Sequence, residues 1–318
     1  MTAPPDITAI QAAWRLIQPH VHYTPLMHSR LLDAHTGARI GFKCENLQRV
    51  GAFKARGACN AVFSLSDAEA RNGVATHSSG NHGAALAMAA AQRGMAAHIV
   101  MPEGVPGVKR EAVAAYGARI IDCEPTLAAR EAALEALVGE TGAQAVHPYK
   151  DPRVIAGQGT VALEILEQMP ELEVLVVPVG GGGLLSGVAL AVKALRPEVE
   201  VVAAEPAGAD DAFRSFGLGE LQPQTNPQTI ADGLRAGLGE INFGIIQRHV
   251  DTILTVEESS IIEAMRLQWT RLKSVVEPSG AVSFAALLEH RERFAGRQVA
   301  CVISGGNVDI DRLPWHAQ

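Results

Sequence analysis

Short apolar runs alternate with longer alanine-rich stretches along the chain from about residue 73 onward. The short runs have the length and β-branched composition of buried strands, and the longer stretches carry apolar residues at helical spacing. Up to residue 140 this pattern predicts strands at 73–76, 97–101 and 119–122 and helices at 81–93, 106–116 and 127–140. Because strands and helices alternate, we expect a parallel sheet covered by helices.

The same alternation returns after residue 150. It predicts helices at 158–168 and 184–195 and strands at 174–177, 199–204 and 299–303. The segment Thr255-Val-Glu-Glu258 has the sequence of a capping box, which predicts a helix that begins just before Glu257. Two α/β units in one chain predict a ligand site in the cleft between them.

Composition narrows the class of protein. The chain has 318 residues, 47% of them hydrophobic, which is enough for a sizeable core, and a net charge of −7 that disfavours nucleic acid as a partner. Four widely spaced cysteines without a CxxC pair argue against a zinc site or a disulfide framework, and favour buried, reduced thiols. With neither a signal peptide nor a membrane-spanning segment in the sequence, we expect a soluble, cytoplasmic protein without a membrane partner.

A run of four glycines follows the strand predicted at 174–177, in the segment Pro178-Val-Gly-Gly-Gly-Gly183, and precedes a helix. Glycines leave the backbone N–H groups free to surround a tetrahedral oxyanion, and the helix adds its positive N-terminal end. Neither a GxGxxG pattern nor a P-loop lysine is present, which disfavours a dinucleotide or a nucleoside triphosphate. The alternative is a flexible turn, but so many glycines are entropically costly without a function. We therefore predict a phosphate site.

A second polar turn, Thr76-His-Ser-Ser-Gly-Asn-His-Gly83, joins a predicted strand to a predicted helix. It places hydroxyls, an amide and free N–H groups at a helix start, an arrangement that suits a carboxylate or a phenolate oxygen. An ordinary helix N-cap explains any single residue here equally well. Only the combination with the other loops favours a functional interpretation.

Lys54 is one of six lysines in the chain and follows Phe53 in the sequence. A lysine partly removed from water has a depressed pKa and can form a Schiff base. Its segment, Gly51-Ala-Phe-Lys-Ala-Arg-Gly-Ala58, resembles the cofactor-lysine motif of the serine racemase and serine/threonine dehydratase family. These are pyridoxal-phosphate enzymes of fold type II, the tryptophan-synthase-β-like fold.

The resemblance covers nearly the whole chain. Within the family, the chain is most similar to serine racemases and threo-3-hydroxyaspartate dehydratases. Seven further motifs appear in the family's order: Thr24-Pro-Leu26, Ser78-Ser-Gly-Asn-His-Gly83, Ala156-Gly-Gln-Gly-Thr160, Pro178-Val-Gly-Gly-Gly-Gly183, Ala204-Glu-Pro206, Ala231-Asp-Gly233 and Ser304-Gly-Gly-Asn307. The segment Glu277-Pro-Ser-Gly-Ala281 differs slightly from the usual family sequence. The resemblance implies two α/β domains with open parallel sheets: a large pyridoxal-phosphate-binding domain of residues 1–68 and 151–318, and a small mobile domain of residues 69–150. It also implies a homodimer.

The resemblance also assigns roles to individual residues. Lys54 would hold pyridoxal 5'-phosphate as a Schiff base and later take the substrate's Cα proton. The other cofactor contacts would be made by Phe53 and Asn81 at the ring, by Gly180, Gly181, Gly182, Gly183 and the N–H of Leu184 at the phosphate, and by Ser304 at the pyridine nitrogen. The substrate carboxylate would be received by Ser78, Ser79, Asn81 and His82.

A serine opposite the ring nitrogen, rather than an aspartate, implies a weaker electron sink, from which a β-hydroxyl leaves readily. The implied reaction is β-elimination of water and ammonia from a small L-β-hydroxy amino acid (threonine, serine or threo-3-hydroxyaspartate) to give a 2-oxo acid. The alternative is a serine or aspartate racemase with minor dehydratase activity, in which Ser79 acts on the face opposite Lys54. A transferase of the cysteine-synthase type is a third possibility. Ser79 and the acidic loop of residues 205–211 argue against it.

Two secondary features remain. In racemase-like relatives the loop matching Glu205-Pro-Ala-Gly-Ala-Asp-Asp211 binds a divalent cation, which implies Mg²⁺ (or Ca²⁺ or Mn²⁺) on Glu205, the carbonyl of Ala209 and Asp211. The alternative is a solvated acidic loop. Arg130 would by default be a surface charge, but it and His147 are also candidates to bind a second substrate carboxylate.

Overall fold

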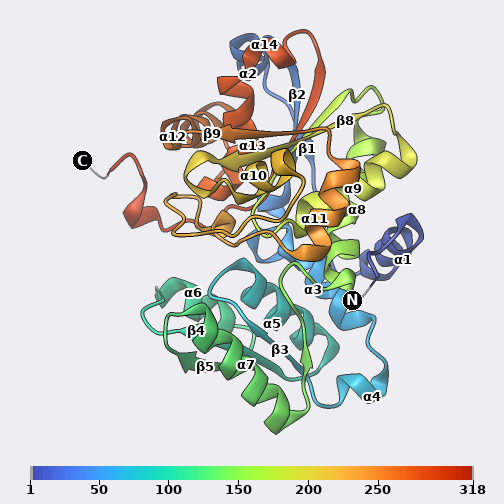
Figure 1. Ribbon diagram of the computed structural model, residues 1–318, viewed down its shortest axis with the longest axis vertical. Coiled ribbons are helices and arrows are strands. Elements are labelled where there is room, and N and C mark those ends of the chain that lie inside the picture. The colour runs from blue at the N-terminus through green and yellow to red at the C-terminus, as the bar shows by residue number, and fades with distance from the viewer. Residues whose placement is uncertain (1–2, 106, 317–318) are drawn as a thin grey trace.

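The computed structural model describes residues 3–105 and 107–316 and contains two sheets (Figure 1). The six-stranded sheet lies in the upper half of Figure 1 and has the order β1-β2-β10-β7-β8-β9. All neighbouring strands in it are parallel except β1, which runs antiparallel to β2. Its strands are β1 (Leu26–Met27), β2 (Arg39–Cys44), β7 (Val174–Pro178), β8 (Glu200–Pro206), β9 (Thr252–Val256) and β10 (Gln298–Ile303).

Helices cover both faces of this sheet, as alternate side chains of β7 show. Val174 and Val176 belong to one apolar cluster, and Leu175 and Val177 belong to another on the opposite face. The helices of this half of the molecule are α1 (Ile7–Ile17), α2 (Arg30–Thr36), α3 (Lys54–Phe63), α8 (Pro152–Gln168), α9 (Gly183–Leu195), α10 (Asp211–Leu218), α11 (Glu240–His249), α12 (Glu258–Leu267), α13 (Pro278–Glu289) and α14 (Arg291–Phe294). We call this sheet and its helices the six-strand lobe.

The four-stranded sheet lies below, is wholly parallel and has the order β5-β4-β3-β6 (Figure 1). Its elements are β3 (Val74–His77), β4 (Ala97–Pro102), β5 (Arg119–Cys123), β6 (Gln144–Ala145), α4 (Asp67–Ala70), α5 (Asn81–Arg93), α6 (Gly107–Ala114) and α7 (Leu127–Thr141). We call it the four-strand lobe. The two parallel sheets confirm the predicted α/β architecture, whereas the domain boundaries at residues 68 and 151 stay a prediction.

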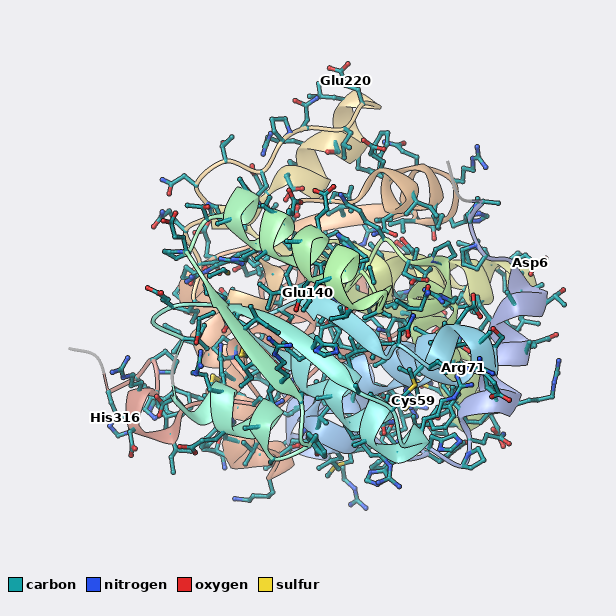
Figure 2. All side chains as sticks on the ribbon, turned by 90° about the horizontal axis from the view of Figure 1, so that it is seen from below. Asp6, Cys59, Arg71, Glu140, Glu220 and His316 are labelled. Carbon is teal, nitrogen blue, oxygen red and sulfur yellow. The ribbon has the colours of Figure 1, made fainter. Side chains whose placement is uncertain are left out.

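Figure 2 views the molecule from the side of the four-strand lobe. The exposed side chains of Asp6 and Glu220 project at its edges, while Cys59 lies inside and is fully buried. All four cysteines are free thiols, three of them buried and Cys123 partly buried. None of the helices in the described part of the chain is long and apolar enough to cross a bilayer.

The predicted elements are confirmed within two residues at each end, except that α8 begins at Pro152, six residues before its predicted start. Residue 106 of the helix predicted at 106–116 lies outside the described residues. The predicted capping box is wrong. The helix α12 begins at Glu258 with Glu257 as its N-cap residue and no side-chain cap. Thr255 instead lies in β9, where it pairs with Glu205 of β8. The tertiary pairing of two strands places Thr255 inside the sheet, where its hydroxyl does not cap the helix.

Helices α3 and α8 approach each other closely because glycines face each other. A Cβ atom at Gly157 would lie 2.6 Å from the Cα atom of Gly57 and 2.7 Å from the carbonyl oxygen of Arg56. Real side chains do not fit at such distances, so glycine is required at this position. The motif Ala156-Gly-Gln-Gly-Thr160 therefore sets how closely α8 supports the helix that begins at Lys54.

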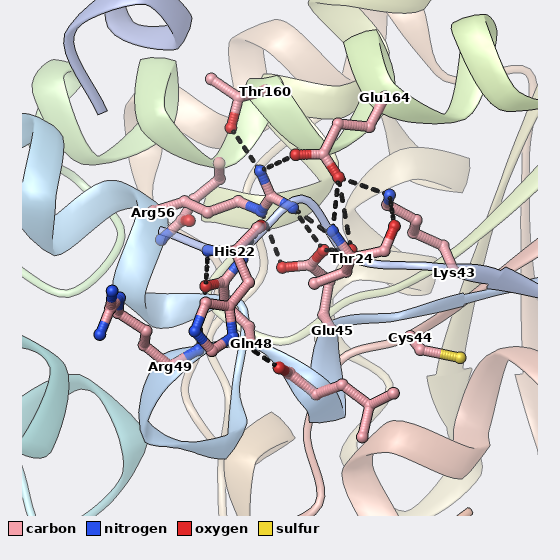
Figure 3. A network of polar contacts seen from close by, with 12 residues as sticks. His22, Thr24, Lys43, Cys44, Glu45, Gln48, Arg49, Arg56, Thr160 and Glu164 are labelled. Atoms are coloured by element: carbon pink, nitrogen blue, oxygen red, sulfur yellow. Dashed lines mark hydrogen bonds and ion pairs between the residues drawn. The ribbon is translucent and has the colours of Figure 1, made fainter. Parts of the chain in front are cut away.

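A network of four fully buried charges joins α3 and α8 to β2 and the turn after it (Figure 3). The Arg56 guanidinium donates to both oxygens of Glu45, at 2.8 and 2.7 Å, and to Glu164 Oε1 at 2.7 Å. Lys43 of β2 donates to the other oxygen of Glu164 and to the carbonyl oxygen of Thr24. Two cations and two carboxylates thus balance, and each of the four has a charged partner.

Arg56→Met should lower the free energy of unfolding by about 3–5 kcal/mol. The reason is that Glu45 would be buried without a counter-charge and that Glu164 would keep only its pair with Lys43. Urea unfolding of the variant measures the loss. The matched control is Arg110→Met, since Arg110 pairs with Asp122 at the partly exposed surface of the four-strand lobe and its removal should cost less than about 1 kcal/mol. Equal losses in both variants would show that the buried network has no special weight.

Candidate active site

A cavity of about 740 Å³ lies between the two lobes, at the carboxyl ends of their strands. Its walls include the turn after β3, the glycine loop after β7 and the turn after β10. In open parallel sheets this is where ligands bind. The cavity brings together all of the predicted cofactor residues: Phe53, Lys54, Asn81, Gly180, Gly181, Gly182, Gly183, Leu184 and Ser304.

Lys54 is the first residue of α3 and lines the cavity beside Phe53. Its Nζ atom donates to the carbonyl oxygen of Pro148 at 2.9 Å and lies 5.0 Å from the centre of the Phe53 ring. Burial lowers the pKa of Lys54 to about 8. An appreciable fraction of the amine is then neutral near pH 7, which is the form that attacks a carbonyl carbon.

The glycine loop presents unpaired N–H groups to the cavity. Among the described residues we find no acceptor for the N–H groups of Gly180 to Leu184, although this backbone is buried. Gly182 has φ = 89°, which favours glycine, and a Cβ atom at Gly181 would lie 2.6 Å from the ring of Tyr149. Buried N–H groups at the start of α9 require an acceptor, and a phosphate fits that requirement.

The turn after β3 contributes Ser78, Ser79 and His82 to the cavity wall. Ser78 Oγ also accepts from the N–H groups of Gly80 and Gly83, so it caps the turn as well. His82 is buried, and its Nε2 atom donates to the carbonyl oxygen of Val146 at 3.2 Å, while Nδ1 has no partner in the described structure. Burial, followed by the charge of Lys54, holds the pKa of His82 well below its usual value, so the ring is neutral.

Asn81 begins α5 and contacts Glu277, a cavity residue to which the sequence analysis assigned no role. The Asn81 Nδ2 atom donates to Glu277 Oε1 at 2.9 Å, and Asn307 donates to Asn81 Oδ1 at 2.9 Å. Burial, followed by the charge of Asp232, raises the pKa of Glu277 to about 8. The sequence offered one signal for this site residue, namely an acidic side chain directly before Pro278, where α13 (Pro278–Glu289) begins.

Arg130 and His147 differ in how the structure places them. Arg130 of α7 lines the cavity, and its buried Nε atom has no partner in the described part of the chain. His147 is not among the lining residues, and its Nδ1 atom accepts from the N–H groups of Tyr149 and Lys150. Burial, followed by Lys150, lowers the pKa of His147 to about 3. Tyr149, which the sequence analysis did not single out, lines the cavity instead.

Glu205 and Asp211, predicted to bind a metal, are buried and lie outside the cavity lining. Glu205 accepts from the N–H groups of Ala212 and Phe213, at 3.0 and 2.7 Å. Asp211 accepts from Gln224 and from the N–H of Leu238. Burial raises the pKa of both carboxyls, that of Glu205 to about 9. Within the described residues no group of three or more His, Cys, Asp and Glu side chains gathers as a metal cluster.

Ser304 completes the cavity at the end of β10. It is buried, and its Oγ atom lies 3.4 Å from the carbonyl oxygen of Ser279, to which it donates. The wall thus combines a desolvated lysine, unpaired backbone N–H groups and neutral hydroxyls. This set suits a carbonyl cofactor that carries a phosphate and a heteroaromatic ring.

Comparisons with known proteins agree with this geometry. A β-hydroxyaspartate dehydratase from Paracoccus denitrificans (strain Pd 1222) is 48% identical over 312 residues, 98% of this chain and 99% of that protein. A serine racemase from Arabidopsis thaliana is 47% identical over 313 residues, 97% of this chain and 95% of that protein. The structure of maize serine racemase matches with a TM-score of 0.96 and 44% identity, covering 99% of this chain and 97% of that one.

Residues 17–305 match the family described as pyridoxal-phosphate dependent enzyme. The full-length structural match confirms the tryptophan-synthase-β-like fold that the motifs predict. The chain therefore belongs to the pyridoxal-phosphate dependent enzyme family.

Proposed function

We propose that this protein is an enzyme of amino-acid metabolism, an ammonia-lyase that removes water and ammonia from a small L-β-hydroxy amino acid. The observation that carries the proposal is Lys54, whose amine is desolvated in a cavity that it shares with the glycine loop and Ser304. The names of the similar dehydratase and racemases support the same substrate class.

In this proposal Lys54 holds pyridoxal phosphate covalently, and the N–H groups of Gly180 to Leu184 bind the phosphate. When bound, the cofactor supplies an electron sink that weakens the Cα–H bond of an attached amino acid. Lys54 Nζ would be released when the substrate amine replaces it on the cofactor and would then take the Cα proton, since its lowered pKa leaves it able to accept one near neutral pH. Phe53 and Ser304 line the cavity, where Phe53 would pack on the cofactor ring and the uncharged hydroxyl of Ser304 would be the partner of the ring nitrogen, a pairing that would favour elimination over a long-lived carbanion.

The turn of Ser78 to His82 receives the substrate's α-carboxylate at the start of α5, where the helix end is positive. Arg130 is the candidate for a second carboxylate, because it lines the same cavity and its buried Nε donor has no partner in the described structure. This supports 3-hydroxyaspartate as a substrate beside serine and threonine. His147 contributes indirectly, since it holds the backbone of Tyr149.

Racemisation is the second candidate activity, and Ser79 supports it. Ser79 lines the cavity, so its hydroxyl is available on the side of the polar turn, whereas Lys54 comes from α3. A serine hydroxyl is a poor acid or base unless neighbours tune it. We therefore expect racemisation as a minor activity beside elimination.

The same proposal includes a structural cation, Mg²⁺ or alternatively Ca²⁺ or Mn²⁺, held by Glu205, Asp211 and the carbonyl of Ala209. Two buried carboxyls whose pKa values are raised by burial support it, because a cation would balance their charge. Homodimeric assembly, a cytoplasmic location and a mobile small domain of residues 69–150 are further parts of the proposal, each implied by the family resemblance.

The purified protein should release a 2-oxo acid from L-serine, L-threonine or a threo-3-hydroxyaspartate, and chiral analysis of the same reactions should show little racemisation.

Lys54→Ala should lose both the yellow cofactor chromophore and all turnover. Arg130→Met should lower kcat/KM roughly ten- to hundredfold for hydroxyaspartate alone, the effect of losing hydrogen bonds to a charged group. Racemisation faster than elimination would overturn the order of the two activities, and a borohydride-reducible cofactor link that persists in Lys54→Ala would overturn the lysine assignment.

Gly181→Ala should weaken cofactor binding and stability together. The new methyl would lie 2.6 Å from the Tyr149 ring, and overpacking of this kind costs about 1–3 kcal/mol. The matched control is Gly139→Ala in α7, where a Cβ atom meets nothing within 4 Å and alanine favours the helix. Fluorescence titration with pyridoxal phosphate and thermal unfolding measure both effects. A Gly181→Ala protein that binds the cofactor like Gly139→Ala would contradict the phosphate assignment.

A chelator should lower the melting temperature, and Mg²⁺ or Ca²⁺ should restore it. A cation at about 100 times its Kd should add roughly 3 kcal/mol to the free energy of unfolding. Asp211→Ala should abolish this response. The control is Asp210→Ala, which loses only a partly exposed pair with Arg214 and should keep the response. If the wild-type protein melts identically in chelator and in Mg²⁺, the loop is merely an acidic turn.

A further inference from the structure

Three polar side chains from separate segments form a continuous chain of hydrogen bonds at the edge of the cavity. They are Asn81 at the start of α5, Glu277 directly before α13, and Asn307 after β10. Asn81 belongs to the four-strand lobe and the other two belong to the six-strand lobe, so the contacts cross between the lobes. We call these residues the amide clasp.

The backbone carbonyl of Val50 settles the orientation of both amides. Asn307 Nδ2 lies 2.7 Å from the carbonyl oxygen of Val50 and 2.9 Å from Asn81 Oδ1. A carbonyl oxygen only accepts, so Asn307 must turn its NH₂ group to Val50, and both its hydrogens are then used. Asn81 in turn must present its oxygen to Asn307, which leaves its own NH₂ group on the side of Glu277.

Val50 is itself held in an unusual conformation. Its φ of 56° and ψ of 15° lie in the left-handed region, which a β-branched residue rarely adopts. Two hydrogen bonds from the segment after β10 support it: the one from Asn307 Nδ2 to the Val50 oxygen and one from the N–H of Gly306 to the oxygen of Gly51, at 2.9 Å. The acceptor that orients the amide clasp is therefore held by two hydrogen bonds from one segment.

Glu277 accepts with both carboxyl oxygens. Oε1 receives Asn81 Nδ2 at 2.9 Å, and Oε2 receives the N–H of Asn307 at 3.1 Å. Glycine at position 305 leaves room for this carboxyl group, because a Cβ atom there would lie 2.4 Å from Oε1. The charged groups that face it are Asp232 and Lys109, which pair with each other. Two donors aimed at two oxygens match the ionised carboxylate, which accepts at both, and these two hydrogen bonds oppose the rise that burial gives the pKa of Glu277.

One hydrogen of Asn81 Nδ2 is used by Glu277, and the second remains for a ligand in the cavity that Asn81 lines. We propose that Glu277 and Asn307 are positioning residues that hold the Asn81 amide so that this N–H donates to the phenolic oxygen of the cofactor. The proposal rests on the proposed function and adds to it the two residues that set the orientation of the donor. Without them the cofactor itself would have to order the Asn81 amide, and that loss of side-chain freedom would weaken the contact.

The test uses cofactor affinity and the absorption spectrum of the bound cofactor, measured without substrate. A donor at the phenolic oxygen stabilises its ionised form, so Asn81→Ala should raise the pH midpoint of the chromophore and weaken binding about tenfold, the effect of one lost hydrogen bond. Glu277→Ala and Asn307→Ala should each reproduce that shift. The double variants with Asn81→Ala should add nothing further, because all three act through one contact.

Glu277→Gln keeps the volume of the side chain, but its amide accepts only one of the two donors, so it should shift the chromophore in the same direction if Glu277→Ala does not fold. The matched control is Glu289→Gln at the other end of α13, where Glu289 accepts from the N–H of Glu257 away from the cavity. It should leave the spectrum unchanged. A wild-type spectrum in Glu277→Gln, or effects that add fully to Asn81→Ala, would overturn the proposal. A wild-type protein without a lysine-bound chromophore would instead refute the proposed function.

Discussion

The arrangement of the site depends on four charges that the protein buries completely. No side chain of this network is exposed to water; its members are Lys43, Glu45, Arg56 and Glu164 (Figure 3). An unpaired charge buried in this way is strongly unfavourable. One relative position of β2 and the turn that follows it, α3 and α8 pairs all four. Because Arg56 lies two residues after Lys54 in α3, the same constraint places the lysine amine at the cavity. Small residues at the contact of α3 with α8 reinforce this placement.

Desolvation is the second organising effect, and it acts differently on each group in the cavity. It lowers the pKa of Lys54 to about 8 and raises that of Glu277 to about 8, while it keeps His82 neutral. An amine that is partly neutral near pH 7 suits a covalent role. The hydrogen bonds from Asn81 and Asn307 oppose the effect of burial on Glu277. A ligand in the cavity would thus meet a small number of oriented donors in an environment of low polarity.

Both lobes contribute to the cavity, so its chemistry depends on how they meet. The glycine loop and Ser304 come from the six-strand lobe, and the turn of Ser78 to His82 with Arg130 comes from the four-strand lobe. The contact of Asn81 with Glu277 and the pair of Lys109 with Asp232 join the two sides. A substrate bound between them would contact donors that neither lobe supplies alone.

The sequence by itself determined the α/β alternation, the glycine loop and Lys54, because strand and helix periodicity and backbone freedom are properties of short segments. Only the tertiary structure decided which side chains meet across long separations. Thr255 pairs within a sheet instead of capping a helix, His147 supports the backbone of Tyr149, and Glu277 enters the cavity beside Asn81. The partners in the buried charge network lie up to 121 residues apart, as Lys43 and Glu164 do. No local pattern encodes such contacts, since they arise from packing between elements.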